Sequence, residues 1–229
     1  ENATGHILTI EDPLEFLHAH KLSVVDQREV GIDTHSYEEA LKNALREAPD
    51  VIMIGEIRDR NTMKQAIAYA ETGHLCLSTL HANNANQAME RVLNFFPEEA
   101  HRQLLVDLSL NLAGVVSQRL IPGLHEKLVP AVEVMLNSSY ISDLIAKGEF
   151  SGIKEAMARS TEIGMCTFDQ ALYQLYTEDR ISLDEALHNA DSRTDLALRI
   201  RLAAGVSTQD AGDLSIDTSS PIQSAARLA

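Results

Sequence analysis

Acidic side chains that directly follow short aliphatic runs are the residues in this chain best placed to do chemistry. Glu56 comes just after Val51–Ile54, an uninterrupted aliphatic run that suits a strand buried on both faces. A carboxylate in that position lies where open α/β sheets bind their ligands. Gly55 lacks a side chain beside it, which predicts that an anionic ligand or a water can approach the backbone there. We therefore interpret Glu56 as a catalytic residue rather than as a group that solvates a strand end.

A second aliphatic run ends in the same way. Ile7–Ile10 is followed by Glu11 and Asp12, and Pro13 ends the run. Two strands would then present acids at their carboxyl ends, and paired acids can hold a hydrated Mg²⁺ or orient a water. Alone, Glu-Asp-Pro is equally typical of an ordinary turn. The second acid at Glu56 favours a site.

Histidines flank a third aliphatic segment. His74 directly precedes this segment and His81 directly follows it, so His81 is expected at the same end of the sheet as Glu56 and Glu11. There an imidazole can donate a hydrogen bond to a phosphate oxygen. His74 is expected at the other end, where a purely structural role is as consistent with the sequence as a binding role. The segment has no His-x-x-x-His pair, so a tight zinc site is not expected.

An alternation of strands and helices would position these groups. The patterns predict strands at 6–10, 51–54 and 75–80 and helices at 36–48 and 61–72, which implies a parallel sheet and an α/β fold. Ser36 with Glu39 has the spacing of a capping box, Asn61 is expected to cap the next helix, and Asn83 and Asn84 the one after it. Gln27–Glu29 fits either an edge strand or a subunit contact.

The second half of the chain reads mainly as helical. The patterns predict a long helical stretch at 98–120, a strand at 128–136, and shorter helices near 139, 153, 167, 182 and 193. We expect three parts: 1–120 as the sheet-bearing part, 121–203 as a mainly helical subdomain, and 204–229 as a disordered tail poor in large apolar residues.

Composition limits the classes of function. The chain has 229 residues, of which 45% are hydrophobic, and 19 Lys and Arg against 34 Asp and Glu give a net charge of -15. This charge argues against nucleic-acid binding as the main activity. Cys76 and Cys166 are too few for a disulfide framework and are expected to be reduced core thiols in a cytoplasmic protein. No apolar stretch is long enough to cross a bilayer, and the first residues have the character of a chain cut from something longer.

Several segments, in one order, resemble motifs of the secretion ATPase superfamily, in particular the type IV pilus retraction ATPases of the PilT and PilU kind. Ile10–Pro13 resembles the Asp box of that family, Ile54–Arg58 its atypical Walker B, and Thr72–His81 its His box. Gln27–Val30 also matches. The similarity extends from Gly5 to about Leu202, and the sequence of Leu80–Ala88 is closer to PilU than to PilT.

The resemblance implies a partial RecA-like P-loop ATPase core in a motor that uses ATP and Mg²⁺ to retract pili in twitching motility. It implies that Glu56 orients or activates the attacking water, that Glu11 assists through Mg²⁺ or water, and that His81 contacts the γ-phosphate. Asp12, Arg58 and His74 lie in the same motifs and are expected to help bind nucleotide. The implied partners are copies of itself in a homo-hexamer, a sister retraction ATPase and an inner-membrane pilus platform protein, without nucleic acid. The implied location is the cytoplasm, peripheral to the inner membrane at the pilus base.

Two departures from the family leave alternatives open. The sequence contains no Walker A loop and no counterpart of the family's amino-terminal domain, so this piece alone is expected not to hydrolyse ATP. Tyr140–Glu149 keeps only the apolar skeleton of the retraction-specific motif, and a packing helix is the alternative. The rival function is an accessory, non-hydrolysing ring or adaptor partner of a sister retraction ATPase. A weaker possibility is that the helical half, 97–202, is an independent interaction module.

Overall fold

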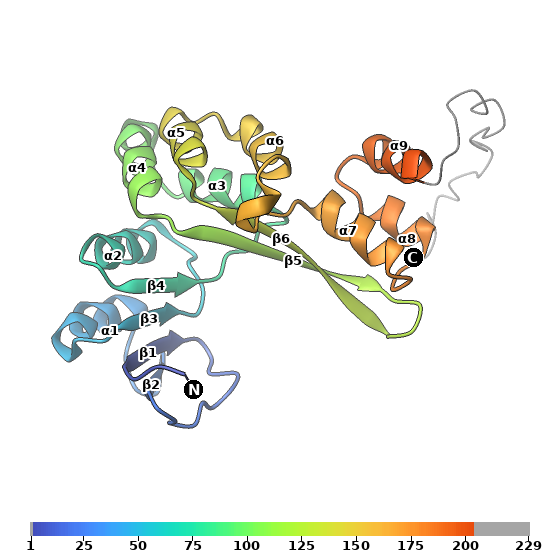
Figure 1. The fold of residues 1–229 in the computed structure, drawn as a ribbon. Coiled ribbons are helices and arrows are strands. Elements are labelled where there is room, and N and C mark those ends of the chain that lie inside the picture. Colours follow the sequence, from blue (N-terminus) through green and yellow to red (C-terminus); the bar gives the residue numbers. More distant parts are fainter. Residues whose placement is uncertain (1, 204–229) are drawn as a thin grey trace, which may run out of the picture.

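The computed structural model describes residues 2–203 of the chain. Its first half consists of β1 (His6–Glu11), β2 (Val24–Glu29), α1 (Tyr37–Ala44), η1 (Leu45–Glu47), β3 (Val51–Ile54), α2 (Arg60–Glu71), β4 (Leu75–Ser78) and α3 (Ala85–Asn94). The second half consists of α4 (Glu98–Asn111), β5 (Gly114–Pro122), β6 (Leu128–Leu136), α5 (Ser139–Lys147), η2 (Phe150–Gly152), α6 (Ile153–Ala158), η3 (Thr161–Ile163), α7 (Phe168–Thr177), α8 (Leu183–His188) and α9 (Arg193–Ala203). Figure 1 shows their arrangement.

Four parallel strands in the order β2-β1-β3-β4 form the main sheet, which confirms the predicted α/β class. Ile10 is in register with Ile54, and Ile54 with Ser78, so β1, β3 and β4 end side by side at one edge of the sheet. Fully buried aliphatic residues, Leu8 and Ile10 in β1 and Ile52 and Ile54 in β3, hold the two strands in the core. Val51 and Met53, on the other face of β3, are only partly buried, so the expected burial of that strand on both faces is incomplete. β2 is an outer strand, which confirms the edge-strand interpretation of Gln27–Glu29.

Helix boundaries follow the capping chemistry, with one correction. Ser36 accepts a hydrogen bond from the backbone N–H of Glu39 at 3.1 Å and starts α1, and Asn84 starts α3 in the same manner. The prediction that Asn61 caps α2 is wrong. The cap is Asp59, two residues earlier, because the helix already begins at Arg60; Oδ1 of Asp59 accepts from the N–H of Thr62 at 2.8 Å.

The predicted helical stretch 98–120 is also wrong in its second half. α4 ends at Asn111, and Gly114–Pro122 is instead strand β5, paired in antiparallel register with β6. A Cβ added at Gly114 would lie 2.6 Å from the carbonyl oxygen of Met135, so the hairpin requires glycine there. Pairing with β6, which lies later in the sequence, decides the conformation of this segment. Strand 128–136 and the shorter helices occur where the sequence predicts them.

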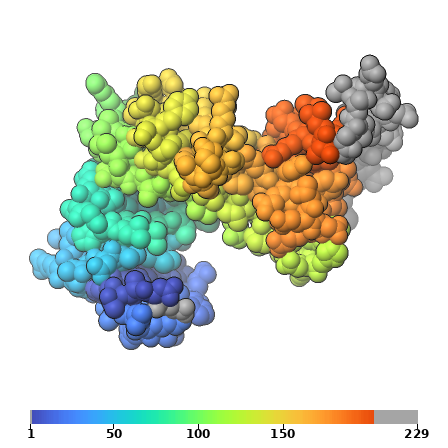
Figure 2. Space-filling view, viewed as in Figure 1, coloured from blue at the N-terminus to red at the C-terminus, as the bar shows by residue number. Residues whose placement is uncertain are grey.

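Two groups of buried side chains stabilise the molecule. The larger group joins the sheet to α1–α6, and the smaller one joins the far part of the β5–β6 hairpin to α7–α9. Figure 2 shows the α7–α9 part, in orange, standing apart from the blue and cyan sheet, with the hairpin between them. Strand β5 crosses residue 120, and the predicted division at 120 and 203 stays a prediction; the expected tail at 204–229 lies outside the described residues. Among residues 2–203, every helix is too short or too polar to cross a bilayer.

Candidate functional site at the carboxyl edge of the sheet

Glu56, Arg58, His81 and Asp12 come together at the edge where β1, β3 and β4 end. Nε2 of His81 lies 3.0 Å from Oε1 of Glu56, and Nε of Arg58 donates to Oε2 of Glu56 at 2.6 Å. Nη1 of Arg58 lies 3.8 Å from Oδ2 of Asp12. The loops after three neighbouring strands therefore contribute to one charged cluster, as the strand-end pattern predicts.

The electrostatics of the cluster keep Glu56 ionised. The hydrogen bond from Arg58 is the largest influence and lowers the pKa of the Glu56 carboxyl below its usual value, helped by the charges of Arg58, His81 and Arg91. Burial acts in the opposite direction but is weaker. The Glu56 side chain is 15% exposed and the His81 side chain 80%. The charged Glu56 carboxylate is thus largely shielded from solvent, and the imidazole that contacts it is mostly exposed.

Glu11 lies beside this cluster, but its carboxylate is directed elsewhere. Its Oε1 accepts hydrogen bonds from the Thr9 hydroxyl at 2.6 Å and from the Gln27 side-chain amide at 3.3 Å. The backbone of Glu11 nevertheless packs against the start of the β3 loop, where the N–H of Gly55 donates to the carbonyl of Ile10. Glu11 and Glu56 therefore share an edge without sharing a hydrogen bond.

Gly55 is required by the protein's own packing. A Cβ added there would lie 3.2 Å from Cα of Glu11 and 3.3 Å from both the carbonyl oxygen of Ile10 and the hydroxyl of Tyr37. These distances are tighter than most real Cβ contacts, so the end of β1 and a tyrosine fill the space. The expectation that Gly55 opens the backbone to a ligand or a water is replaced by this close approach of protein atoms.

Tyr37 is the member of the site that the sequence reasoning missed. Burial raises the pKa of its phenol, the negative charges of Asp12, Glu56 and Glu11 raise it further, and Arg58 opposes them. A signal was present in the sequence. In a parallel α/β sheet, a crossover helix begins at the carboxyl edge of the strands, and Tyr37 directly follows the predicted cap Ser36.

His74 lies away from the cluster. It precedes β4, its Nδ1 is 3.0 Å from the Thr72 hydroxyl, and its ring meets the edge of Tyr69. These contacts fasten the turn after α2, where Gly73 has a positive φ of 92°. The expected role of His74 in nucleotide binding stays a prediction from the resemblance.

Glu11, Asp12 and Glu56 offer carboxylate oxygens, the ligands that Mg²⁺ prefers, either directly or through water. Within residues 2–203, the three such side chains whose ligand atoms all lie within 4.8 Å of one another are instead His6, Asp26 and Glu47, at the opposite end of the sheet. Arg28 forms an ion pair with Glu47, however, so that carboxylate is already neutralised.

Two cavities lie near the sheet. One, of about 720 Å³, is bordered by β4, α2, the end of α4 and the start of β5. The other, of about 420 Å³, lies between the first turns of α1 and α2 and includes Tyr37 and Asp59. Glu11, Glu56 and His81 line neither of these two cavities.

Both cysteines are free, as the sequence predicts. Burial raises the pKa of the Cys76 thiol to about 11 and also raises that of Cys166. Neither thiol is therefore ionised at neutral pH, and thiolate chemistry is not supported.

Comparisons with known proteins agree with the motif resemblance. The chain is 58% identical to "Type IV pilus ATPase PilU" of Pseudomonas aeruginosa over 216 residues, which is 94% of this chain and 56% of that protein. It is 41% identical to "Type IV pilus retractation ATPase PilT" of the same species over 185 residues, or 81% of this chain and 54% of that protein. The chain thus spans about half the length of the curated relatives it matches.

The solved structures give the same answer for the fold. The crystal structure of the pilus retraction motor PilT with bound ADP superposes with a TM-score of 0.78 at 38% identity, covering 86% of this chain and 56% of that one. The expected partial ATPase core and the resemblance to PilT and PilU are thereby confirmed. Residues 1–195 match the family model described as "Type II/IV secretion system protein". Because this match covers most of the 229 residues, the chain belongs to the type II/IV secretion system protein family.

Proposed function

We propose that this chain is part of an ATP-hydrolysing motor subunit that drives type IV pilus retraction and twitching motility. The observation that carries the proposal is the ionised Glu56 carboxylate at the sheet edge, in contact with His81. The names of the relatives, a pilus ATPase and a pilus retraction ATPase, support the same activity. Because the chain spans about half of these relatives, the activity is assigned to the full-length protein.

In this proposal Glu56 orients the attacking water and accepts its proton. A carboxylate with a lowered pKa is ionised at neutral pH, so it can accept a hydrogen bond from that water, and Arg58 holds it in place. His81 is exposed enough to turn its N–H toward the γ-phosphate of ATP. Arg58 and Asp12 then lie beside the bound phosphates.

Glu11 is assigned to Mg²⁺, with Asp12 next to it. When bound, Mg²⁺ would neutralise charge on the phosphate oxygens. Glu11 is held by Thr9 and Gln27, so it would act at a fixed position and through water rather than by swinging toward Glu56. The Asp12 side chain is 44% exposed, so solvent reaches its carboxylate.

The proposal also covers assembly and location. The full-length protein would form a homo-hexamer, work with a sister retraction ATPase and act on an inner-membrane pilus platform protein from the cytoplasmic side. The net charge of -15 supports partners other than nucleic acid.

The decisive experiment compares ATP turnover by the full-length protein with that of its Glu56→Gln variant. Loss of a general base is expected to lower turnover by about 10²- to 10⁴-fold. Glu71→Gln, at the exposed end of α2, is the matched control and should keep normal turnover. Equal rates of ATP turnover in the wild type and in Glu56→Gln would reject the proposed enzymatic activity. In that case, stimulation of a sister ATPase by both proteins would establish the rival function, an accessory ring partner.

A further inference from the structure

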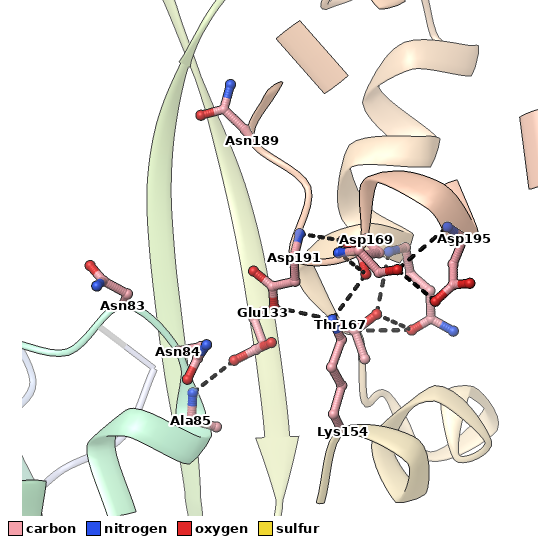
Figure 3. A network of polar contacts seen from close by, with 12 residues as sticks. Asn83, Asn84, Ala85, Glu133, Lys154, Thr167, Asp169, Asn189, Asp191 and Asp195 are labelled. Carbon is pink, nitrogen blue, oxygen red and sulfur yellow. Dashed lines mark hydrogen bonds and ion pairs between the residues drawn. The ribbon is translucent and has the colours of Figure 1, made fainter. Parts of the chain in front are cut away.

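The loop that carries His81 is fastened at its far end to the β5–β6 hairpin. After His81 the chain runs through Asn83 to the first residue of α3, Ala85. The carbonyl of Asn83 accepts from Nη2 of Arg119 at 3.2 Å, and the N–H of Ala85 donates to Oε1 of Glu133 at 2.8 Å. Figure 3 shows Asn83, Asn84 and Ala85 facing the strand that carries Glu133. The position of the loop therefore depends on two charged side chains of the hairpin.

Arg119 also binds the C-terminal helices. Its Nη1 donates to the carbonyl of Asn189 at 3.0 Å and its Nη2 to Oδ1 of Asp191 at 2.8 Å. Its guanidinium carbon lies 3.9 Å from the centre of the Phe168 ring, at the start of α7. A guanidinium presents several donors in one rigid plane, so it can connect segments that do not touch each other. Arg119 thus joins the His81 loop to α7 and to the segment between α8 and α9.

Glu133 makes a parallel connection. Glu133 is 3% exposed, and its Oε1 accepts a hydrogen bond from the backbone N–H of Ala85, the first residue of α3. The backbone of Phe168, the first residue of α7, is close enough to lower the pKa of the same carboxyl. One buried carboxylate therefore lies at the starts of two helices that belong to different parts of the molecule.

The C-terminal side of this connection is itself well fixed. Nζ of Lys154 lies 3.0 Å from Asp169 and 3.3 Å from Asp191, and the N–H of Asp191 donates to Asp169 at 2.8 Å. Figure 3 shows Lys154 reaching from α6 toward both carboxylates. Lys154 belongs to α6, which packs in the larger, sheet-side group of buried residues, so these ion pairs also fasten α7 and the α8–α9 segment to that part of the molecule.

We propose that Arg119 is a positioning residue that sets His81 against Glu56 according to the placement of α7–α9. The inference rests on the proposed ATPase function and deepens it. Arg119 touches neither Glu56 nor His81; it acts through the Asn83 carbonyl. When α7–α9 shift relative to the sheet, Arg119 carries the shift to the loop, and the 3.0 Å contact between His81 and Glu56 changes. The alternative is that this network only stabilises the fold.

The first test does not depend on ATP hydrolysis. Hydrogen exchange of the backbone amides at 80–85 is measured in the full-length protein, in Arg119→Gln and in the control Arg180→Gln. Arg180 pairs with Glu126 at 3.0 Å and connects the hairpin loop to the end of α7, but it does not contact the His81 loop. We expect exchange at 80–85 to become roughly tenfold faster in Arg119→Gln, as for the loss of one hydrogen bond to a charged donor. Arg180→Gln should leave it unchanged.

Exchange within α7 shows whether the helices remain folded. If Arg119→Gln fails to fold, Asp191→Asn removes instead the negative charge that anchors the guanidinium, and the same faster exchange at 80–85 is expected. Normal exchange at 80–85 in a folded Arg119→Gln protein, or in Asp191→Asn where Arg119→Gln does not fold, would overturn the proposal.

The second test asks whether Arg119 acts through His81. In the full-length enzyme, Arg119→Gln is expected to lower kcat with little change in KM, because the loop acts on the transferred phosphate. Combined with His81→Ala, it should add no further loss, since the group it positions is already gone. Independent, multiplicative losses would overturn the proposal. If the full-length protein lacks ATPase activity, the proposed function fails while the exchange experiment still decides the coupling.

Discussion

The imidazole Nε2 of His81 lies 3.0 Å from Oε1 of Glu56, while Arg58 holds the other oxygen of the same carboxylate. Both oxygens of Glu56 therefore already have a partner. A water that Glu56 is to orient must use one of the remaining lone pairs or take the place of His81. If His81 turns toward a phosphate, it frees Oε1 at the moment when the water is needed.

Arg58→Gln should raise the pKa of Glu56. It removes the hydrogen bond that contributes most to the lowering of that pKa. Because the folded-state pKa is depressed, the stability that Glu56 contributes is present above the unfolded pKa and is lost as pH falls through the folded pKa. The variant should lose this contribution at a higher pH than the wild type does. Carboxyl carbon shifts in NMR titrations would measure the change, and Arg46→Gln, at an exposed position in η1, should leave the pKa of Glu56 where it was.

Asp59→Ala should destabilise the fold by about 1 kcal/mol, the usual effect of losing a helix cap. The side chain of Asp59 accepts the N–H of Thr62 at 2.8 Å and starts α2 directly after the site. Asn61→Ala is the matched control, because Asn61 lies inside the first turn and caps nothing. Urea unfolding midpoints would compare the two. A larger loss from Asn61→Ala would contradict the cap assignment.

Ile52→Ala should cost about 2–5 kcal/mol of unfolding free energy, as for other large-to-small changes in a close-packed core. Ile52 is fully buried in β3, the strand that carries Glu56 at its end. Ile32→Ala changes the same side chain at an exposed position and should cost little. Denaturant unfolding measures both, and similar losses in the two variants would show that β3 is not a core strand.

Glu133→Gln should become more stabilising, relative to the wild type, as pH rises. Burial is the largest influence and raises the pKa of Glu133. The hydrogen bond from the Ala85 N–H lowers this pKa, and the negative charge of Asp191 raises it. The folded state then binds the proton more tightly than the unfolded chain does. The stability that Glu133 contributes is therefore fully present below its ordinary pKa of 4.5, and it is lost as pH rises through the pKa of the folded state. Glutamine keeps an acceptor for Ala85 but cannot ionise.

Unfolding free energies of the two proteins at several pH values would check this prediction. Glu155→Gln, at an exposed position in α6, should show a difference that does not grow with pH in this way. A stability difference between Glu133→Gln and wild type that is constant from pH 4.5 to 7 would contradict the raised pKa of Glu133.

The sequence was sufficient to predict the sheet and the edge on which Glu56 and His81 meet, because buried parallel strands can be recognised from short aliphatic runs. It was insufficient where contacts with residues distant in the sequence determine the conformation of a segment. β5 forms because it pairs with β6, and no local pattern separates Val115 and Val116 from the apolar face of the preceding helix. The turning of Glu11 toward Gln27 depends on the neighbouring strand β2, and Tyr37 reaches the site only because α1 starts beside it.

β4 is the outermost strand on one side of the sheet, and its Leu75 and Leu77 side chains are 50% and 48% exposed. Within residues 2–203, the backbone N–H and C=O groups along its outer side pair with no further strand of the sheet. Such a margin is a template onto which foreign β-chains can add. A preparation of these residues by themselves would therefore tend to self-associate and precipitate as its concentration rises. A lysine in place of Leu77 would be the simplest way to keep it in solution.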